Sequence, residues 1–326
     1  MPHLSVIVPT YNSSLTIAEC LKAIRGSDFQ DYELIIADGA SQDTTCSIAK
    51  KYANTVLQLS GKLKRSHVRK RGAEAASGSI IVNIDSDIVI RPDTLSRISQ
   101  YFSRHSDIYA ATGLLSKEHP HKNFFSQYKN LYMNYVFGRL PEKITFLYGS
   151  IYAFRRYGTE EYGPDIEVAD DTAFGQHLTA GGKNIGFIKD LEVIHMKRHD
   201  LFSFIKNDFR IPFDWANIFM KYKGFQQLFR NKTGFAHSPK EQLLSVALAP
   251  VILLFGILSL SCRLPFLYIL LYMVLAWLFL NVRFFVFLYK EKGIFFTSLA
   301  IPVTFIDNII MFAGIICGFT KCLIKY

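Results

Sequence analysis

The pattern of hydrophobic positions changes along the chain. In the first part, short β-branched and aromatic runs at residues 4–8, 32–37, 55–59 and 79–84 alternate with segments of helical spacing. Such runs predict strands, and their alternation with helices is typical of a mostly parallel sheet with helices on both faces. We therefore expect an α/β fold for this part of the chain.

A different pattern follows residue 240, where three long apolar stretches contain few charges. They cover residues 243–261, 264–280 and 294–323, and each reaches or approaches the ~20 apolar residues with which a helix crosses a bilayer. We expect about three transmembrane helices. A two-span or re-entrant arrangement stays open, because the second apolar run continues beyond Arg283.

Between these two parts, basic residues are interleaved with aromatic ones. Residues 197–240 hold nine Lys or Arg and only three Asp, a composition that predicts amphipathic helices lying at a membrane surface. Nucleic-acid binding would use the same residue types, but the adjacent membrane span favours lipid. The expected organisation is a soluble domain at 1–195, interfacial helices at 196–241 and a transmembrane region at 242–326.

Lys and Arg near the spans indicate the orientation of the chain. Basic residues precede the first span and follow the second, which places the N-terminal domain in the cytosol by the positive-inside rule. The apolar run at 4–8 is too short for a signal peptide, and none is expected. The sequence predicts an integral protein of the cell inner membrane or an equivalent membrane.

The overall charge and the cysteine content limit the classes of partner and of metal or disulfide site that the chain can have. The 326 residues include 37 Lys or Arg and 27 Asp or Glu, a net charge of +10, which suits a partner that carries phosphates. The five cysteines contain no Cys-x-x-Cys pair, so neither a zinc site nor a disulfide framework is indicated.

Polar residues follow three predicted strands at the point where each strand ends. Ligands of parallel sheets bind at this edge, although turn chemistry alone explains any single one of the motifs. Two carboxylates directly after a buried strand need a counter-charge, and Mg²⁺ or Mn²⁺ shared with diphosphate oxygens supplies it. The residues concerned are Pro9, Thr10, Tyr11, Asn12, Asp38, Asp85, Ser86 and Asp87.

Together these motifs resemble the family 2 inverting glycosyltransferases. The matching segments are SVIVPTYN at 5–12, ELIIAD at 33–38, Arg69 with Gly72, and Asp85-Ser86-Asp87, and the resemblance covers roughly residues 4–195. It implies a GT-A fold and a nucleotide-sugar donor, with UDP favoured. Pro9, Tyr11 and Asp38 would hold the base and ribose, and Asp85 and Asp87 would bind a divalent metal. Arg69 would lie near the diphosphate, or else on a solvated helix face beside its basic neighbours.

The resemblance also implies an acceptor side. Asp170 and Asp171 occupy the place of the family's acidic pair, and Asp171 is the candidate general base that takes the proton of an attacking hydroxyl. An N-cap of the following helix is the alternative for both. A polyprenyl phosphate acceptor would need no base. His195 is a candidate third metal ligand or a neutral donor to the diphosphate, or a histidine that merely ends a strand.

Three positions depart from the family pattern, namely Gly39, Lys70 and His177, and no Gln-x-x-Arg-Trp segment follows Asp171. The absence of a Gln-x-x-Arg-Trp segment after Asp171 favours transfer of a single sugar over processive synthesis. We expect a membrane-bound enzyme that moves one sugar to a lipid-linked or glycan acceptor. A nucleotide-sugar-binding scaffold without turnover stays open, and a transporter is disfavoured because Arg283 and Asp307 alone offer a poor pathway.

Overall fold

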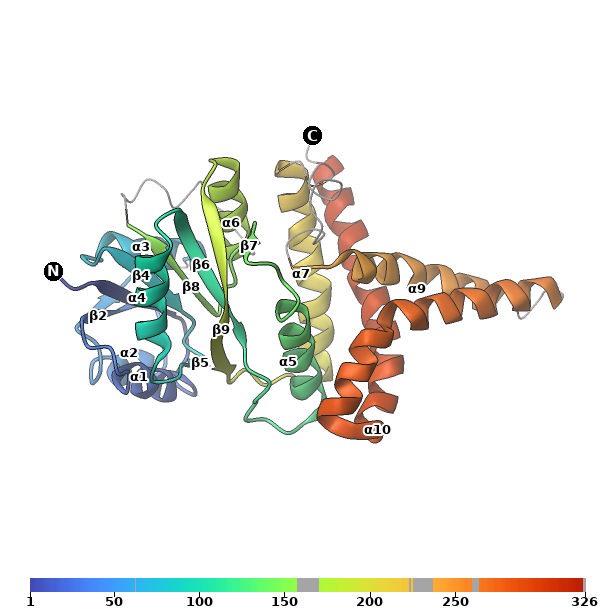
Figure 1. Cartoon of the computed structure of the whole chain (residues 1–326), viewed down its shortest axis with the longest axis horizontal. Helices are drawn as coiled ribbons and strands as arrows, with labels where there is room; N and C mark the ends of the chain where they lie inside the picture. Colours follow the sequence, from blue (N-terminus) through green and yellow to red (C-terminus); the bar gives the residue numbers. More distant parts are fainter. Residues whose placement is uncertain (62, 157–169, 223, 225–236, 260–263, 325–326) are drawn as a thin grey trace. The chain divides into compact units, whose positions relative to one another are not determined.

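The chain forms two compact units. The computed structural model describes residues 1–61, 63–156, 170–222, 224, 237–259 and 264–324 (Figure 1). Within them, residues 1–122 and 137–198 make an N-terminal unit, whereas residues 123–136 and 199–326 make a helical unit. The segment 123–136 thus groups with the C-terminal helices, although it lies inside the range that the sequence pattern assigned to the soluble domain.

Four parallel strands form the first half of the sheet in the N-terminal unit. Their order is β3-β2-β1-β4, and β1 and β4 are buried along their whole length. Because β1 and β4 are buried on both faces, their sequences are continuous β-branched and apolar runs. The strands are β1 (Leu4–Thr10), β2 (Tyr32–Asp38), β3 (Thr55–Gln58) and β4 (Ile80–Ile84), which confirms the four predicted strands and the α/β class.

The second half of the sheet mixes strand directions. β8 (Ile151–Arg155) runs antiparallel to both β4 and β6 (Ile108–Leu115), and β9 (Asn184–His195) is parallel to β6. The short strands β5 (Ile88–Val89) and β7 (Lys143–Ile144) pair with β9. Because β8 enters the sheet beside the end of β4, the residues just before β8 lie next to the residues just after β4.

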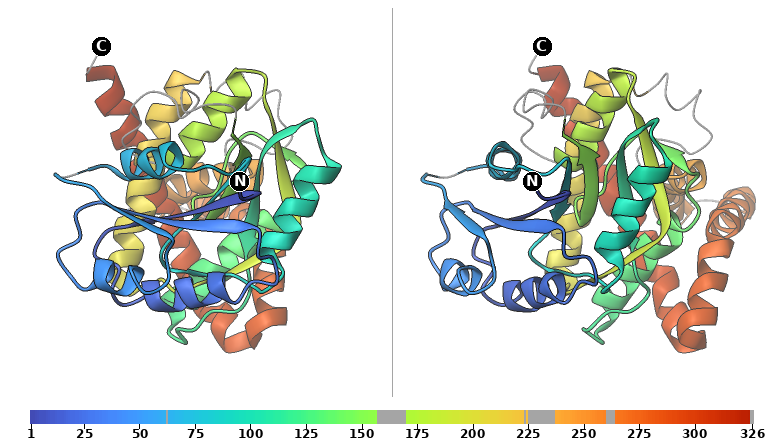
Figure 2. Two further views of the ribbon diagram at one scale, coloured as in Figure 1. Left: turned by 90° about the vertical axis from the view of Figure 1, so that its left-hand side faces the viewer. Right: turned by 60° about the vertical axis from the view of Figure 1, so that its left-hand side comes forward.

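Helices cover both faces of the parallel strands. Figure 2 shows α1 (Ile17–Arg25) and α3 (Arg65–Glu74) on opposite sides of β1 and β2. α3 packs closely because Gly72 faces β1, where a Cβ atom would lie 2.5 Å from Ile7. The remaining helices of this unit are α2 (Thr45–Ala49), α4 (Thr94–Arg104) and α6 (Asp170–Ala180).

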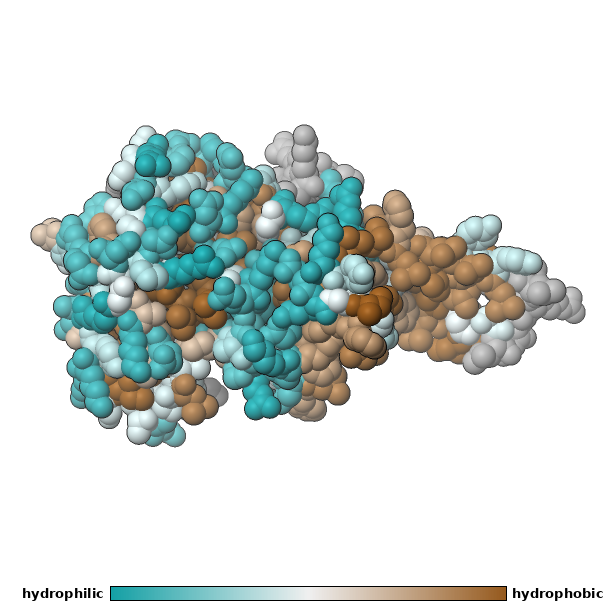
Figure 3. All heavy atoms as spheres, turned by 60° about the horizontal axis from the view of Figure 1, so that its bottom comes forward, coloured by the Kyte–Doolittle hydropathy of each residue, from teal (hydrophilic) through white to brown (hydrophobic). Residues whose placement is uncertain are grey.

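The helical unit contains the apolar C-terminal helices. α9 (Lys240–Ser259) and α10 (Leu264–Ile324) are long and apolar enough to cross a membrane, judged by length and composition. Gly293, with φ of 77°, divides α10 into two helical segments, so helices cover all three predicted stretches within the described residues. Figure 3 shows an apolar surface over these helices, which requires lipid or protein to cover it.

Polar side chains join these helices inside the unit. Ser245 of α9 accepts hydrogen bonds from Asn281 and Asn308 of α10, at 2.7 and 2.6 Å. α5 (Phe124–Phe137) contributes Lys129, which forms an ion pair with the buried Asp208 of α7 (Leu201–Lys221). In an apolar environment such hydrogen bonds contribute about 0.6–2 kcal/mol each. They therefore fix which helix faces meet.

α7 and α10 approach each other through two glycines. A Cβ atom at Gly314 would lie 2.3 Å from the carbonyl oxygen of Phe209, and one at Gly318 would lie 2.4 Å from that of Phe213. This Gly-x-x-x-Gly spacing lets helix backbones touch. The predicted interfacial helix α7 is therefore packed directly on a predicted membrane helix, while Leu201 remains exposed at its start. The part of the basic stretch at 223 and 225–236 lies outside the described residues.

Replacement of Gly314 by Leu should separate α7 from α10, because the new side chain has no room. We expect a loss of about 1–3 kcal/mol in stability, as for other overpacked sites, seen as a lower melting temperature of the detergent-solubilised protein. Gly256→Leu is the control, since nothing lies within 4 Å of a Cβ atom there. Equal melting temperatures for the two variants would contradict this packing.

Candidate functional site

The ends of β1 and β2 are tied together around a buried aspartate. Asp38 is 2% exposed. One carboxylate oxygen accepts hydrogen bonds from the hydroxyls of Thr10 and Ser41, at 2.9 and 2.5 Å, and the other accepts the Ser41 backbone N–H at 2.9 Å. The Asn12 N–H in turn donates to the Ser41 hydroxyl at 2.8 Å. The two loops are thus held in one arrangement.

Strained backbone marks the same edge of the sheet. Asn12 and Ala40 have φ of 48° and 67°, a conformation that costs a non-glycine residue about 1–3 kcal/mol. The Gln42 N–H donates to the Asn12 side chain at 2.8 Å, which helps to hold that conformation. Tyr11, between these loops, is 63% exposed. Its ring is therefore free to stack against a planar group such as a nucleotide base.

The Asp85-Ser86-Asp87 segment follows β4 and lies next to the first loop. The Ser86 hydroxyl donates to that of Ser13 at 2.9 Å, and His195 Nε2 lies 3.2 Å from Asp87 Oδ2. Burial alone would raise the pKa of Asp87, but His195, Lys197 and Arg65 overcome this effect and hold the pKa at about 2. Asp87 is therefore a carboxylate at any physiological pH.

Arg69 is a buried cation that bridges two carboxylates. Its side chain is 1% exposed, and its guanidinium lies 2.6 Å from Asp85 and 2.7 Å from Asp170. It also donates to the Gly149 carbonyl at 3.2 Å. Burial opposes its charge, yet the two carboxylates raise the pKa of Arg69 well above its usual value. Arg69 is thus permanently charged and joins α3, the turn after β4 and α6.

Asp171 is the second residue of α6 and lies beside this bridge. Its carboxylate accepts the Gly149 N–H at 2.5 Å and the Thr172 N–H at 2.7 Å. Burial and the neighbouring charge of Asp170 raise its pKa above the usual aspartate value. A carboxylate with a raised pKa is better suited to accept a proton than an ordinary one. Asp171 lies inside α6 and accepts the N–H of the very next residue, whereas an N-cap accepts an N–H two or three residues further along the chain.

The acidic and histidine side chains at this edge fit a metal ion whose remaining ligands come from the substrate. Among the described residues, no three His, Cys, Asp or Glu side chains are arranged to hold an ion by themselves. Asp87 and His195 point to one another and are 28% and 18% exposed, while Asp85 is engaged by Arg69. Mg²⁺ and similar ions often take only one or two carboxylates, with diphosphate and water as the other ligands.

Most residues selected from the sequence therefore lie at one sheet edge, where Asp85 contacts Arg69 and Asp87 contacts His195. Their assignments to donor, metal and proton transfer stay predictions. Gly149 begins the segment 149–156, which resembles the family's acceptor-side strand, but sequence reasoning did not select it as a site residue. Its peptide contacts both Asp171 and Arg69. A Cβ atom at this position would lie 2.9 Å from Asp171.

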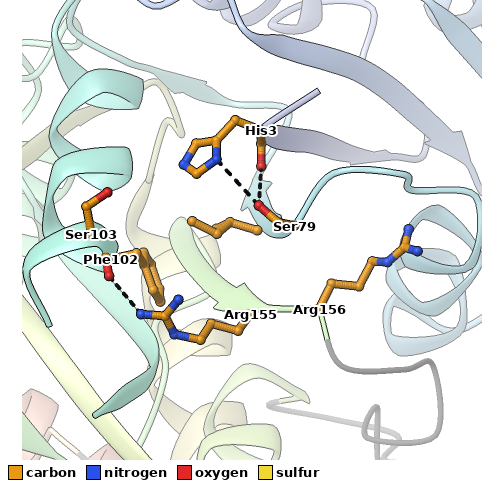
Figure 4. A pocket seen from close by; sticks show the side chains of 7 residues that line it. His3, Ser79, Phe102, Ser103, Arg155 and Arg156 are labelled. Carbon is orange, nitrogen blue, oxygen red and sulfur yellow. Dashed lines mark hydrogen bonds between the residues drawn. The ribbon is translucent and has the colours of Figure 1, made fainter. Parts of the chain in front are cut away.

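A separate hollow lies at the opposite ends of the strands. It is lined by His3, Ser79, Phe102, Arg155 and others (Figure 4). Arg155 donates to the backbone carbonyls of Phe102 and His105, at the end of α4, and so caps a helix. This hollow plays no part in the site described above.

Comparison with known proteins agrees with the sequence motifs. Residues 5–163 match the family model described as glycosyl transferase family 2. A β-1,3-glucosyltransferase of GalNAc(5)-diNAcBac-PP-undecaprenol from Campylobacter jejuni is 30% identical over 31% of this chain and 34% of its own length. A poly(ribitol-phosphate) β-N-acetylglucosaminyltransferase from Staphylococcus aureus is 32% identical over 33% of this chain and 20% of its own length.

Among solved structures, a mannosyltransferase from Pyrobaculum calidifontis has the same fold, with a TM-score of 0.58 at 18% identity over 99% of this chain and 88% of that one. The chain spans about a third of the length of the first of these curated relatives and a fifth of the second. Over residues 5–163, just under half of its length, this chain matches glycosyl transferase family 2.

Proposed function

We propose that this protein is a membrane-bound inverting glycosyltransferase that moves one sugar from a nucleotide-sugar donor to a lipid-linked or glycan acceptor. The observation that carries the proposal is the gathering of Asp38, Asp85 and Asp87 at the carboxyl edge of the parallel strands. This edge is where open α/β sheets bind nucleotides.

The donor would bind across the three strand ends. Tyr11 is positioned to stack on the base, and Asp38 lies at the end of β2 where a base or ribose can reach its loop. Asp87 and His195 would hold a divalent metal, which neutralises charge on the departing diphosphate. The mannosyltransferase neighbour was crystallised with GDP-Man and Mn²⁺, and this supports metal use. UDP is favoured as the nucleotide from the motif resemblance.

The acceptor would approach from the side of Asp171. An inverting displacement brings the attacking oxygen to the sugar carbon from the face opposite the nucleotide, so a carboxylate there takes the proton of a hydroxyl acceptor. The Gly149 N–H orients Asp171 by a direct hydrogen bond. Arg69 in turn holds the Gly149 carbonyl and pairs with Asp170. The Campylobacter and Staphylococcus relatives act on an undecaprenol-linked glycan and a ribitol-phosphate polymer, which supports acceptors of these two kinds.

The helical unit would hold the enzyme at the membrane. α9 and α10 provide the spans, and α7 packs on α10 through Gly314 and Gly318. The basic residues beside the first span support a cytosolic orientation of the N-terminal unit. Such an anchor suits an enzyme whose acceptor is itself a lipid.

A donor screen tests the proposal directly. The purified full chain is mixed with a panel of nucleotide sugars, with and without Mn²⁺, and its melting temperature is measured. The nucleotide sugars that bind are then supplied in labelled form with a membrane lipid extract. Transfer of label to lipid supports the proposal. Binding without transfer or hydrolysis would instead identify a donor-binding scaffold.

Asp87→Ala should abolish metal-dependent transfer, because it removes the carboxylate nearest to His195. Expression, membrane insertion and melting temperature should change little, since Asp87 is partly exposed. Transfer is measured over a range of Mn²⁺ concentrations. Unchanged turnover and metal dependence in this variant would refute the metal assignment.

The pH profile of kcat/KM should report the raised pKa of Asp171 when the acceptor is a hydroxyl. Because a base works only when deprotonated, activity is lost as pH falls through the raised pKa, above the usual aspartate range. Asp170→Asn removes a charge that raises this pKa, so the acidic limb should move to lower pH. Asp171→Asn should lower turnover far more than donor affinity. A limb that neither substitution moves would rule out Asp171 as the base.

Arg69→Ala should destabilise the N-terminal unit strongly, because it leaves Asp85 and Asp170 without their buried partner. Removing one member of a buried ion pair costs about 3–5 kcal/mol, measurable by denaturant unfolding. Arg71→Ala is the matched control, since Arg71 pairs with Glu74 at the surface and such pairs contribute at most about 1 kcal/mol. Similar losses of unfolding free energy in the two variants would show that the buried Arg69 ion pairs contribute no more stability than a surface pair.

A further inference from the structure

The buried position of Arg69 leaves the diphosphate without the cation that the sequence pattern assigned to it. Both terminal nitrogens of Arg69 are engaged, one by Asp170 and the other by Asp85 and Gly149. The side chain is 1% exposed, so a ligand at the sheet edge cannot displace these partners without opening the bridge. Another cation is needed to meet the negative charge of a leaving nucleotide.

Arg65 occupies the right place on the same helix. It is the first residue of α3, exactly one i to i+4 step before Arg69, and residues with this spacing share one face of a helix. Its side chain is exposed. Among the described residues, none forms a salt bridge with its guanidinium. Its charge nevertheless lowers the pKa of both Asp87 and Asp171, so Arg65 is close enough to act on both carboxyl groups.

The position of Arg65 does not serve the stability of α3. A cation in the first turn of a helix opposes the helix dipole, and α3 has no acidic residue there and no side-chain cap. Within the described part of the chain, ion pairs join Asp85 and Asp170 to Arg69, and Asp87 to His195. An anionic ligand would offset the unfavourable cation at the start of α3, and a metal bound with it would offset the negative charge of the carboxylates.

We propose that Arg65 is the substrate-contacting cation of the leaving nucleoside diphosphate. This inference rests on the proposed transferase function. In the reaction, the bond between the sugar carbon and the diphosphate oxygen breaks while the acceptor oxygen bonds to the sugar. The diphosphate retains the electron pair of the broken bond, and Arg65 stabilises that growing charge through its N–H donors.

Kinetics and binding of Arg65→Ala test the assignment. UDP and GDP are titrated against the purified full chain with Mg²⁺, alongside the matching nucleosides uridine and guanosine. We expect Arg65→Ala to weaken nucleoside diphosphate binding and to lower kcat/KM by about 10- to 100-fold, the range of a lost charge-assisted hydrogen bond. Nucleoside binding should stay unchanged. Arg65→Lys should recover part of the loss, because it restores charge without the guanidinium fork.

Arg71→Ala again serves as the control, because Arg71 is an exposed arginine of the same helix that pairs with Glu74. If Arg65→Ala leaves diphosphate affinity intact, or raises only the KM of the acceptor, the assignment to the leaving group is overturned and the transferase proposal stands. If the unaltered protein binds neither UDP nor GDP and transfers no sugar, the transferase function itself fails and this inference falls with it.

Discussion

The buried guanidinium of Arg69 is the constraint on which the candidate site depends. A charge at 1% exposure is tolerated only with full compensation, and Asp85 and Asp170 provide it from segments 16 and 101 residues away in the chain. This one side chain therefore fixes the turn after β4 against the start of α6. The carboxylates proposed for the donor and those proposed for the acceptor are held at a set separation as a result.

Much of the N-terminal unit is predictable from its sequence. Apolar and β-branched runs identify β1, β2, β3 and β4. β1 and β4 are buried along their whole length, whereas β3, at the edge of the sheet, is only partly buried. The convergence of Asp38 with Asp85 and Asp87 follows from a rule of topology, since parallel strands end at one edge. These inferences use only local pattern and the general behaviour of parallel sheets.

The rest depends on contacts that local pattern does not encode. Arg65, Arg69 and Arg71 look alike in the sequence, yet one is exposed near the site, one is buried and one pairs at the surface. The small residues Gly72, Ala73 and Ala76 give a weak signal for a buried face near Arg69. In the helical unit, apolar composition predicts α9 and α10. The close approach of α7 depends on Gly314 and Gly318, whose spacing does not by itself indicate which helix packs there.

Gly149 places bare backbone against two charged side chains of the site. Its N–H binds Asp171 and its carbonyl binds Arg69, and a Cβ atom would lie 2.9 and 3.2 Å from these side chains. At this position the site is lined by a peptide group, and any residue other than glycine would press its Cβ atom against these charged groups. In the proposed transferase, differences in sugar or acceptor preference would therefore arise from exposed side chains of the site, such as Tyr11 and Arg65.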